Sequence, residues 1–441
     1  MHTRFIQGFS KFDKTEKTDW LVQNFTTDPT AARQLLHRFN LSDAEQQRIL
    51  DGFSENTVAN FPMPFGIAPN FIINGRTYAV PMVIEESSVV AAASAAAKYW
   101  SQYGGFQTRV LGTEKVGQVH FCWRGNVAKL RALLPHLEQH LRAEAAELTT
   151  RMERRGGGIL GMELLDFTEE EPDYYQLRVR FDTRDSMGAN FINSVLERFG
   201  STLRDYVCDQ PGFTPEECEL RIIMCILSNY TPQCTVRAEV RVRLEELQHV
   251  GELEAREFAD RIATAVRIAR LDPYRAVTHN KGIYNGIDAV ILATGNDFRA
   301  IEAAGHAYAA RDGRYRSLSQ CTVEDGEFRM WLDVPLALGT VGGLTKLHPL
   351  AKLSLDILGN PSAEELMQIV AAVGLAQNFA AVRSLVTTGI QRGHMKMHLQ
   401  NILNHLGATP EQCDEAVDYF AERTVSFGAV RKFLTKSEKL V

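Results

Sequence analysis

The sequence lacks the features that direct a protein to a membrane, to secretion or to a nucleic acid. No apolar run approaches the ~20 residues that a membrane-spanning helix requires, and the first residues contain no apolar core of a signal peptide. The formal net charge is −6, so no basic surface is expected for a nucleic acid or an anionic membrane. These absences predict a soluble, cytoplasmic protein with neither kind of partner.

Cysteine is scarce and follows no pattern. None of the cysteines belongs to a CxxC pair, their number is odd, and no spacing between them is repeated. Such a set fits reduced intracellular thiols better than a disulfide framework or a zinc site. The seven are Cys122, Cys208, Cys218, Cys225, Cys234, Cys321 and Cys413.

A change of pattern near residue 108 predicts an inserted domain. The chain of 441 residues is too long for one small core. Strand and helix patterns alternate over roughly 110 residues, which is typical of a separate small domain. We therefore predict an α+β fold with a large, mainly helical domain in two parts, a small α+β domain inserted between them, and a helical C-terminal segment. The predicted segments are 1–107, 108–217, 218–384 and 385–441.

Several local elements follow from turn and capping signals. Residues 28–52 predict two helices, the second opened by "SDAE", and the "NG" at 74–75 predicts a hairpin. The alanine-rich stretch 85–105 predicts a central core helix, because alanine occurs on every face of it. Residues 126–155 predict one long amphipathic helix, and residues 251–270 predict another.

The stretch 278–297, "THNKGIYNGIDAVILATGND", places a lysine among turn-forming residues. Its apolar run "DAVILATG" predicts a short buried strand. Lys281 would then lie at one end of the strand and Asp297 at the other, in a pocket lined by loops. A solvated surface charge is the alternative interpretation of Lys281.

Two motifs suggest cofactor or metal chemistry but fit it poorly. "GGGILG" at 156–161 matches the dinucleotide fingerprint, yet it follows a helix and precedes a strand, so a glycine turn that ends a helix is favoured. His394 and His398 are spaced to share a helix face, but no third metal ligand accompanies them. A catalytic acid is the better functional interpretation of His394, and a buried core histidine is the structural alternative.

Two further segments leave alternatives open. Glu85 and Glu86 open the alanine-rich helix, either as acids that complement its dipole or as a pair with one carboxyl group turned inward for proton transfer. The loop 185–190, "DSMGAN", leads into a helix, and its backbone N–H groups suit either a phosphate group or a simple helix start.

Together, in this order, six segments between about residues 50 and 405 resemble one family, the soluble class II 3-hydroxy-3-methylglutaryl-CoA (HMG-CoA) reductases of bacteria. The segments are "ENTVANFPMPFGIAPNF", "VPMVIEESSVVAAAS", "DSMGAN", "DPYRAVTHNKGIYNGIDAVILATGND", "GTVGGLTKLHP" and "GIQRGHMKMH". The resemblance implies an NAD(P)H-dependent enzyme that reduces the HMG-CoA thioester to mevalonate and free coenzyme A in two hydride transfers, or runs the reverse reaction. It implies no metal.

The resemblance also assigns residues. By motif match, the catalytic residues are Glu86, Lys281, Asp297 and His394. The positions that hold the hydroxymethylglutaryl group are matched by Ser88, Arg275 and Asn285. The dinucleotide-binding loop of the family's small, non-Rossmann domain is matched by Asp185, Ser186, Met187, Gly188, Ala189 and Asn190. A homodimer or a higher even-numbered homo-oligomer is implied, with active sites where subunits meet and with His394 on a C-terminal flap.

The chemistry of these residue types agrees with the assigned roles. Hydride attack on a thioester develops an oxyanion, which the Lys281 cation would stabilise while Asp297 positions the lysine. An imidazolium such as His394 can protonate the departing thiolate, and a protonated Glu86 can donate to the final alkoxide. Arg275 can bind the free carboxylate of the substrate in a bidentate manner.

The sequence departs from the family pattern in two places. Ser87 stands where the family often has proline, which loses rigidity at a helix entry but should spare the chemistry. In relatives that use NAD, we expect an acid about seven residues before the triple glycine, to bind the ribose hydroxyls. Here that residue is Thr149, followed by Thr150 and three arginines. Hydroxyls and arginines suit a 2′-phosphate, so NADPH is expected in preference to NADH.

Two other functions remain compatible with the sequence. One is an NAD(P)-dependent enzyme on the same scaffold that acts on a different acyl-CoA or aldehyde. Loss of Arg275 should prevent binding of a substrate with a free carboxylate and spare one without it, which would distinguish the two functions. The other is a binding protein that keeps the fold without catalysis, for which the test is whether HMG-CoA drives cofactor oxidation.

Overall fold

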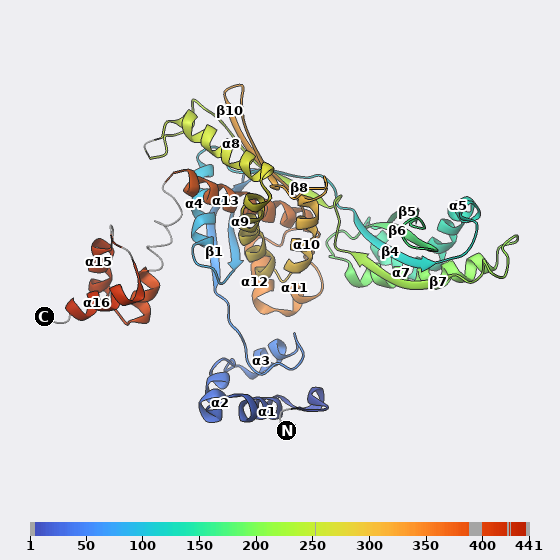
Figure 1. The fold of residues 1–441 in the computed structure, drawn as a ribbon, viewed down its shortest axis with the longest axis horizontal. Helices are drawn as coiled ribbons and strands as arrows, with labels where there is room; N and C mark the ends of the chain where they lie inside the picture. Colours follow the sequence, from blue (N-terminus) through green and yellow to red (C-terminus); the bar gives the residue numbers. More distant parts are fainter. Residues whose placement is uncertain (1–4, 252, 388–398, 421–422, 424, 438–441) are drawn as a thin grey trace.

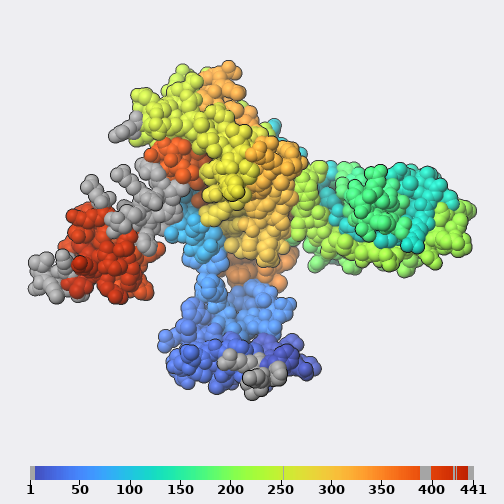
Figure 2. All heavy atoms as spheres, in the orientation of Figure 1, coloured from blue at the N-terminus to red at the C-terminus, as the bar shows by residue number. Residues whose placement is uncertain are grey.

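The computed structural model describes residues 5–251, 253–387, 399–420, 423 and 425–437. A central body carries an N-terminal helical part, an inserted part that contains a sheet, and a C-terminal helical part, each projecting from it (Figures 1 and 2). Separate hydrophobic cores fill the body, the insert and the C-terminal part. The fold is therefore mixed α+β, as predicted.

The N-terminal part contains three helices that begin after aspartates. The carboxylate of each aspartate accepts a hydrogen bond from a backbone N–H of the first turn, which satisfies a group that the helix itself leaves unpaired. The pair predicted over 28–52 is confirmed, although the second helix is capped by Asp43 and not by the serine before it. The helices are α1 (Lys14–Phe25), α2 (Pro29–Arg38) and α3 (Ala44–Asp51), after a short 3₁₀ turn at Phe9–Lys11.

The central body combines a hairpin, a four-stranded antiparallel sheet of order β3-β8-β10-β9, and helices packed on both. Asn74 and Gly75 form the hairpin turn with φ of 50° and 79°, as the sequence predicts. The elements are β1 (Phe65–Ile73), β2 (Arg76–Val83), α4 (Val89–Ser101), β3 (Gln107–Val110), β8 (Thr235–Arg243), α8 (Ala255–Leu271), α9 (Pro273–Ala293), α10 (Phe298–Ala309), β9 (Ser319–Glu324), β10 (Glu327–Pro335), α11 (Leu344–Leu347), α12 (Pro349–Ile357) and α13 (Ala363–Val386).

The alanine-rich helix is central but shorter than expected. Helix α4 has 13 residues, whereas α9 and α13 have 21 and 24. Its small side chains Ala93, Ala96 and Ala97 are buried, which lets β1 and α13 pack closely against it. The long helices of the body are therefore α9 and α13, and α9 carries the predicted lysine.

The insert is an antiparallel sheet of order β5-β6-β4-β7 packed against α5, α6 and α7. Strands at "VGQVHFCW" and "YYQLRVRFDT" and the helix after "DSMGAN" are confirmed, and the triple glycine connects a helix to a strand as expected. The long helix predicted over 126–155 is broken at Ala145 into two helices. The elements are β4 (Lys115–Cys122), α5 (Val127–Glu144), α6 (Ala146–Glu153), β5 (Gly158–Asp166), β6 (Tyr174–Asp182), α7 (Ala189–Cys208) and β7 (Arg221–Ser228).

The predicted end of the insert at residue 217 is too early. Strand β7 lies beyond this boundary, yet it pairs with β4 along most of its length. At the other end, β3 pairs with β8 of the central sheet, so the insert begins after β3. Sequence composition does not show which sheet a strand joins, and for that reason the predicted boundary is wrong.

The strand predicted at "DAVILATG" is wrong, because these residues form the end of α9 and the turn after it. Asp272 caps this helix and Pro273 occupies its first turn. Its second half is buried on nearly all sides, so it shows no helical periodicity and resembles a buried strand in sequence. Gly286 lies in the helix interior, where an added Cβ would be 2.9 Å from the Val373 carbonyl oxygen of α13. Gly286 therefore permits close packing of α9 on α13. The turn that follows the end of α9 is formed at Gly295, which has φ of 69°.

Helix α13 is long and apolar enough to span a membrane by those two criteria alone, with a mean hydropathy of 1.6. However, 67% of the 18-residue stretch of α13 with this hydropathy is buried inside the protein. It contacts α4, α8, α9 and the central sheet, as expected of a core helix.

The C-terminal part contains residues 399–405 in helical form and the helices α15 (Pro410–Tyr419) and α16 (Phe427–Ser437). They enclose a small core of their own, which includes Leu403, Phe420 and Val430. The predicted helical character of this segment is confirmed for these residues.

A partly buried carboxyl pair, Asp288 of α9 and Glu302 of α10, gives a stability prediction. Burial, and next the neighbouring Glu302 carboxylate, raise the pKa of Asp288 to about 8, against about 3.9 in an unfolded chain. The native state therefore holds this proton more tightly. Its contribution to stability is full below about pH 4 and is lost as the pH rises through about 8.

We expect Asp288→Asn, which cannot ionise, to be more stable than the wild type at about pH 8, by ~1 kcal/mol or more, with the gain shrinking towards about pH 5. Thermal unfolding at both pH values measures this. The exposed Asp312→Asn is the matched control. Identical pH slopes for the wild type and Asp288→Asn would contradict the assignment.

Candidate functional site

Lys281 and Glu86 lie together, although they are far apart in sequence. The Lys281 ammonium donates to Glu86 Oε2 at 2.5 Å, and the Asn285 amide nitrogen lies 3.4 Å from the same oxygen. Lys281 and Asn285 are one helical turn apart on α9, so both face the loop that precedes α4. Three of the predicted site residues thus form one polar cluster.

The helix surface beside Lys281 is open. No atom of the described residues would lie within 4 Å of a Cβ placed on Gly282, so none of them covers the backbone of α9 next to the ammonium. Beneath this surface, His279 is buried, and its Nε2 lies 2.6 Å from Ser319 Oγ. Burial lowers the pKa of His279 to about 3, so its imidazole is neutral near pH 7. His279 therefore anchors α9 through Ser319 and adds no positive charge near Lys281.

Ser88 has an unusual backbone conformation at the start of α4. Its φ is 75°, in the left-handed region that non-glycine residues rarely adopt, and its hydroxyl makes no capping hydrogen bond. Such strain typically costs about 1–3 kcal/mol and is concentrated at functional sites. The hydroxyl is therefore available to a ligand two residues from Glu86.

Arg275 lies half-buried in the first turn of α9. Burial lowers the pKa of its guanidinium from the usual value, yet arginine stays charged under all ordinary conditions. No hydrogen bond or ion pair joins its guanidinium to another of the described residues. A partly desolvated cation without a carboxylate partner is suited to an anionic ligand.

Asp297 does not join this cluster within one chain. It caps α10, where its carboxylate accepts from the backbone N–H groups of Arg299 and Ala300. From Lys281 to the end of α9 at Ala293 the helix rises by ~18 Å, far more than the ~4 Å of an ion pair. His394 and His398 lie outside the described residues.

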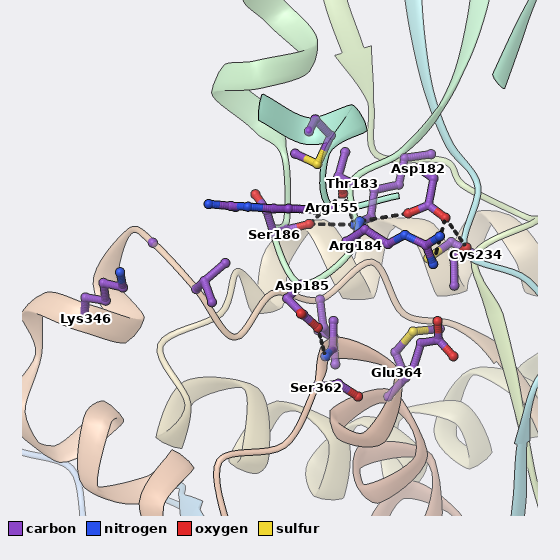
Figure 3. Close-up of a pocket in the computed structure, with 18 residues that line it drawn as sticks. Arg155, Asp182, Thr183, Arg184, Asp185, Ser186, Cys234, Lys346, Ser362 and Glu364 are labelled. Atoms are coloured by element: carbon purple, nitrogen blue, oxygen red, sulfur yellow. Dashed lines mark hydrogen bonds and ion pairs between the residues drawn. The ribbon is translucent and has the colours of Figure 1, made fainter. Parts of the chain in front are cut away.

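A second candidate site is a cavity of 740 Å³ between the insert and the central body, a size that suits a cofactor. Figure 3 shows Thr183, Arg184 and Ser186 on one side of it and Ser362 and Glu364 on the other. The predicted Asp185 joins the two sides, because its carboxylate accepts from Ala363 N at 2.8 Å and its carbonyl accepts from Thr340 N.

The loop that lines this cavity requires glycine at one position. Gly188, the N-cap of α7, has φ of 88°, and an added Cβ would lie 2.4 Å from the Thr183 side chain. No side chain caps α7 there, so the first backbone N–H groups of the helix are left for another acceptor. This tight loop and its cationic surroundings fit the phosphate groups of a dinucleotide.

Other predicted cofactor residues lie away from the cavity wall. Only Asp185 and Ser186 of the loop line the cavity. Thr149 is 1% exposed, and its hydroxyl bonds within its own helix. It does not line the cavity, although the sequence predicts that it helps to bind the cofactor. Arg155, one of the arginines after it, does line the cavity.

Three cations that line the cavity, Lys115, Arg184 and Lys346, were not predicted as site residues from the sequence. Arg184 precedes the predicted loop by one residue, and a wider window would have included it. Lys115 opens β4 far from the loop in sequence, and no motif marks it. Among the described residues, no group of three or more histidine, cysteine or acidic side chains is arranged to hold a metal ion.

Comparison with known proteins identifies the family of this chain. The family model described as hydroxymethylglutaryl-coenzyme A reductase matches residues 16–399. The chain is 39% identical over 390 residues to 3-hydroxy-3-methylglutaryl-coenzyme A reductase of Archaeoglobus fulgidus, covering 86% of this chain and 85% of that protein. It is 34% identical over 354 residues to a probable reductase of Borreliella burgdorferi, covering 80% of this chain and 78% of that protein.

Solved structures point to the same family. The reductase of Streptococcus pneumoniae superimposes with a TM-score of 0.72 at 37% identity, covering 98% of this chain and 99% of that one. A second structure, the class II enzyme of the same organism bound to NADPH in open conformations, gives a TM-score of 0.71 at 36% identity, covering 93% and 100%. By sequence and by structure, the chain belongs to the class II hydroxymethylglutaryl-coenzyme A reductase family.

Proposed function

We propose that the Lys281–Glu86 cluster carries out the reduction of the HMG-CoA thioester to mevalonate and coenzyme A, with two hydrides that NADPH or NADH supplies when bound. The observation that carries this proposal is the ion pair at 2.5 Å beside a bare helix surface. A cation at such a place stabilises the negative charge that develops on the carbonyl oxygen in each step.

The other residues of the cluster support a proton path. Glu86 is in direct contact with Lys281, so a proton can pass between them and then to the alkoxide product. Asn285 holds the Glu86 carboxylate from the same helix face. Ser88 and Arg275 would bind the hydroxymethylglutaryl group, since the Ser88 hydroxyl makes no capping hydrogen bond and no described residue bonds the Arg275 guanidinium. His394 is proposed to protonate the departing thiolate, on sequence grounds alone.

We propose a homodimer, or a higher even-numbered assembly, in which Asp297 reaches Lys281 of the neighbouring chain. Two observations support it. Asp297 is too far from Lys281 along the helices of its own chain, and large apolar side chains are exposed nearby, including Leu271, Tyr274 and Val277. Light scattering would test it: a fully active particle of 49.4 kDa would contradict a shared site.

NADPH is the proposed cofactor in preference to NADH, and the binding site is proposed at the cavity lined by Asp185 and Ser186. Arg155 and Arg184 supply guanidinium groups suited to a 2′-phosphate, whereas Thr149 no longer supports this preference. The ratio of kcat/KM for the two cofactors measures it, and a tenfold or greater preference for NADH would end it.

The cytoplasm is the proposed location. All seven cysteines are free thiols, as suits a reducing compartment.

The primary test follows the absorbance of the reduced nicotinamide with purified protein and HMG-CoA, with NADPH and NADH in separate assays. Oxidation of two cofactors for each mevalonate formed is the expected result. Folded, dimeric protein that oxidises neither cofactor would exclude the proposed function and favour a binding protein that keeps the fold.

Arg275→Ala distinguishes HMG-CoA from acyl-CoA substrates that lack a free carboxylate. We expect kcat/KM for HMG-CoA to fall by about 10²-fold, because the substrate carboxylate loses charge-assisted hydrogen bonds. Activity on an acyl-CoA analogue without that carboxylate should not fall. Steady-state kinetics with both substrates measures this, and the exposed Arg267→Ala is the control. Equal losses on both substrates would place Arg275 outside the carboxylate site.

A further inference from the structure

Lys115 is a buried cation at the junction of the insert and the central body. It is the first residue of β4, and only 6% of it is exposed. Its ammonium donates to Thr183 Oγ1 and, at 2.8 Å, to the carbonyl oxygen of Ser186. Both acceptors belong to the loop that precedes α7, so the ammonium lies behind this loop and holds it in place.

Neither of these acceptors carries a charge. The carboxylates of Asp182 and Asp185 act on Lys115 through space, and each accepts hydrogen bonds from other groups. Asp182 accepts from Arg184 N at 2.8 Å and from Thr113 Oγ1 at 3.2 Å, and Asp185 accepts from Ala363 N at 2.8 Å. Burial of a cation without a bonded anion opposes folding.

Lys115, which has no bonded anion, lines the 740 Å³ cavity. An ammonium has three N–H donors, and two of them are used by the loop. Arg155, Arg184 and Lys346 line the same cavity, which gives it four cationic side chains against three carboxylates, those of Asp182, Asp185 and Glu364. An anion that entered would supply the partner that Lys115 lacks.

We propose that Lys115 binds the diphosphate of the nicotinamide dinucleotide and, through Thr183 and Ser186, positions the loop that receives it. The inference rests on the proposed function, because it assumes that a dinucleotide occupies this cavity. The phosphate group that binds Lys115 could also be the 2′-phosphate of NADPH. Because NADH has the diphosphate but no 2′-phosphate, comparison of the two cofactors separates these sources. The diphosphate is favoured because Lys115 bonds the loop that leads to the N-terminus of α7, where backbone N–H groups converge.

The decisive variant is Lys115→Met, which removes the charge and keeps an unbranched side chain of similar length. We expect the dissociation constants of NADH and NADPH to rise by about tenfold or more, and to a similar extent. They are measured by titration of the nicotinamide fluorescence. The unfolding temperature of the ligand-free variant should equal or exceed that of the wild type, because a buried unpaired charge has been removed. A residue with only a structural role would lower that temperature.

Two further variants separate the charge of Lys115 from its hydrogen bonds to the loop. Lys115→Gln can still donate to Thr183 and Ser186 but carries no charge, so it should bind both dinucleotides as weakly as Lys115→Met. Recovery of wild-type affinity in Lys115→Gln would mean that Lys115 only shapes the loop, and it would overturn the diphosphate contact. Lys352→Met removes an exposed lysine of α12 and should change neither affinity nor unfolding temperature.

Each remaining outcome has a definite meaning. Weaker binding of NADPH alone would overturn the diphosphate assignment in favour of the 2′-phosphate. Unchanged affinity for both cofactors in folded Lys115→Met would overturn the inference while leaving the proposed function intact. Failure of the wild type itself to bind either dinucleotide would overturn both.

Discussion

Lys281→Ala is expected to lower kcat by about 10²–10³-fold with either cofactor while the protein keeps its fold. The ammonium is the cation of the cluster formed with Glu86 and Asn285. Each hydride transfer places negative charge on the substrate oxygen, and a fixed cation beside that oxygen stabilises the transition state more than the ground state. Water that fills the space left by the side chain would replace the charge poorly.

Stability should change little, which separates this variant from a folding defect. The side chains of Lys281 and Glu86 are 59% and 39% exposed, and an ion pair so exposed contributes at most about 1 kcal/mol. Alanine also has a higher helix propensity than lysine, which offsets part of this loss. We therefore expect thermal unfolding of Lys281→Ala to follow that of the wild type closely.

Steady-state kinetics and thermal unfolding of Lys281→Ala provide the measurement, with Lys352→Ala, an exposed lysine of α12, as the matched control. The variant should be slow on HMG-CoA and also on the free aldehyde that corresponds to the half-reduced substrate, because both reactions create an oxyanion. A kcat within about threefold of the wild type would exclude Lys281 from oxyanion stabilisation.

Local signals in the sequence predicted the local structure well. The Asn74–Gly75 turn requires two positive φ angles, which this residue pair adopts readily, so the hairpin could be predicted from two residues. Alternation in "YYQLRVRF" identified β6, since one face of the strand packs on α7 and the other does not. Such features depend only on neighbours in the chain.

Features set by tertiary packing could not be predicted in this way. The second half of α9 is enclosed on nearly all sides, so burial erased the periodicity that would have marked it as a helix. Whether β7 belongs to the insert is decided by its hydrogen bonds with β4, more than a hundred residues earlier in the chain. The motif match paired Asp297 with Lys281, but the length of α9 between Lys281 and its end at Ala293 keeps the two residues apart within one chain.

The residues of the candidate site also divide into those that a motif identifies and those whose role depends on tertiary packing. Glu86, Lys281 and Asn285 were named from motifs, and the structure brings them together. Lys115 has no motif, because its role depends on burial and on the loop packed over it. Thr149 was chosen by its distance from the triple glycine, yet the helix turns its side chain into the interior of the insert.

Glu86→Gln is expected to lower kcat for HMG-CoA by about 10²–10⁴-fold, the range associated with loss of a general acid. Glutamine keeps the shape of glutamate and can still accept a hydrogen bond from Lys281 through its amide oxygen. It cannot take up and release a proton, so the new alkoxide would have to draw its proton from water.

The neighbouring Glu85 offers a close control for this change. It is exposed, whereas Glu86 is partly buried against α9, and the two residues share the same loop. Glu85→Gln makes the same chemical change one residue away and should keep kcat within about twofold, because its carboxylate faces solvent. Losses of similar size in both variants would point to a general effect of charge and not to proton donation by Glu86.

Comparison of two substrates locates the step at which Glu86 acts. If Glu86 protonates the alkoxide formed by the second hydride, Glu86→Gln should slow reduction of the free aldehyde as much as reduction of HMG-CoA. Reduction of the aldehyde releases no thiolate, so a group that serves only the departing coenzyme A would leave it unaffected. An aldehyde reduction rate equal to that of the wild type would therefore move Glu86 to the thioester step. The contact with Lys281 would then serve to orient the cation that both steps require.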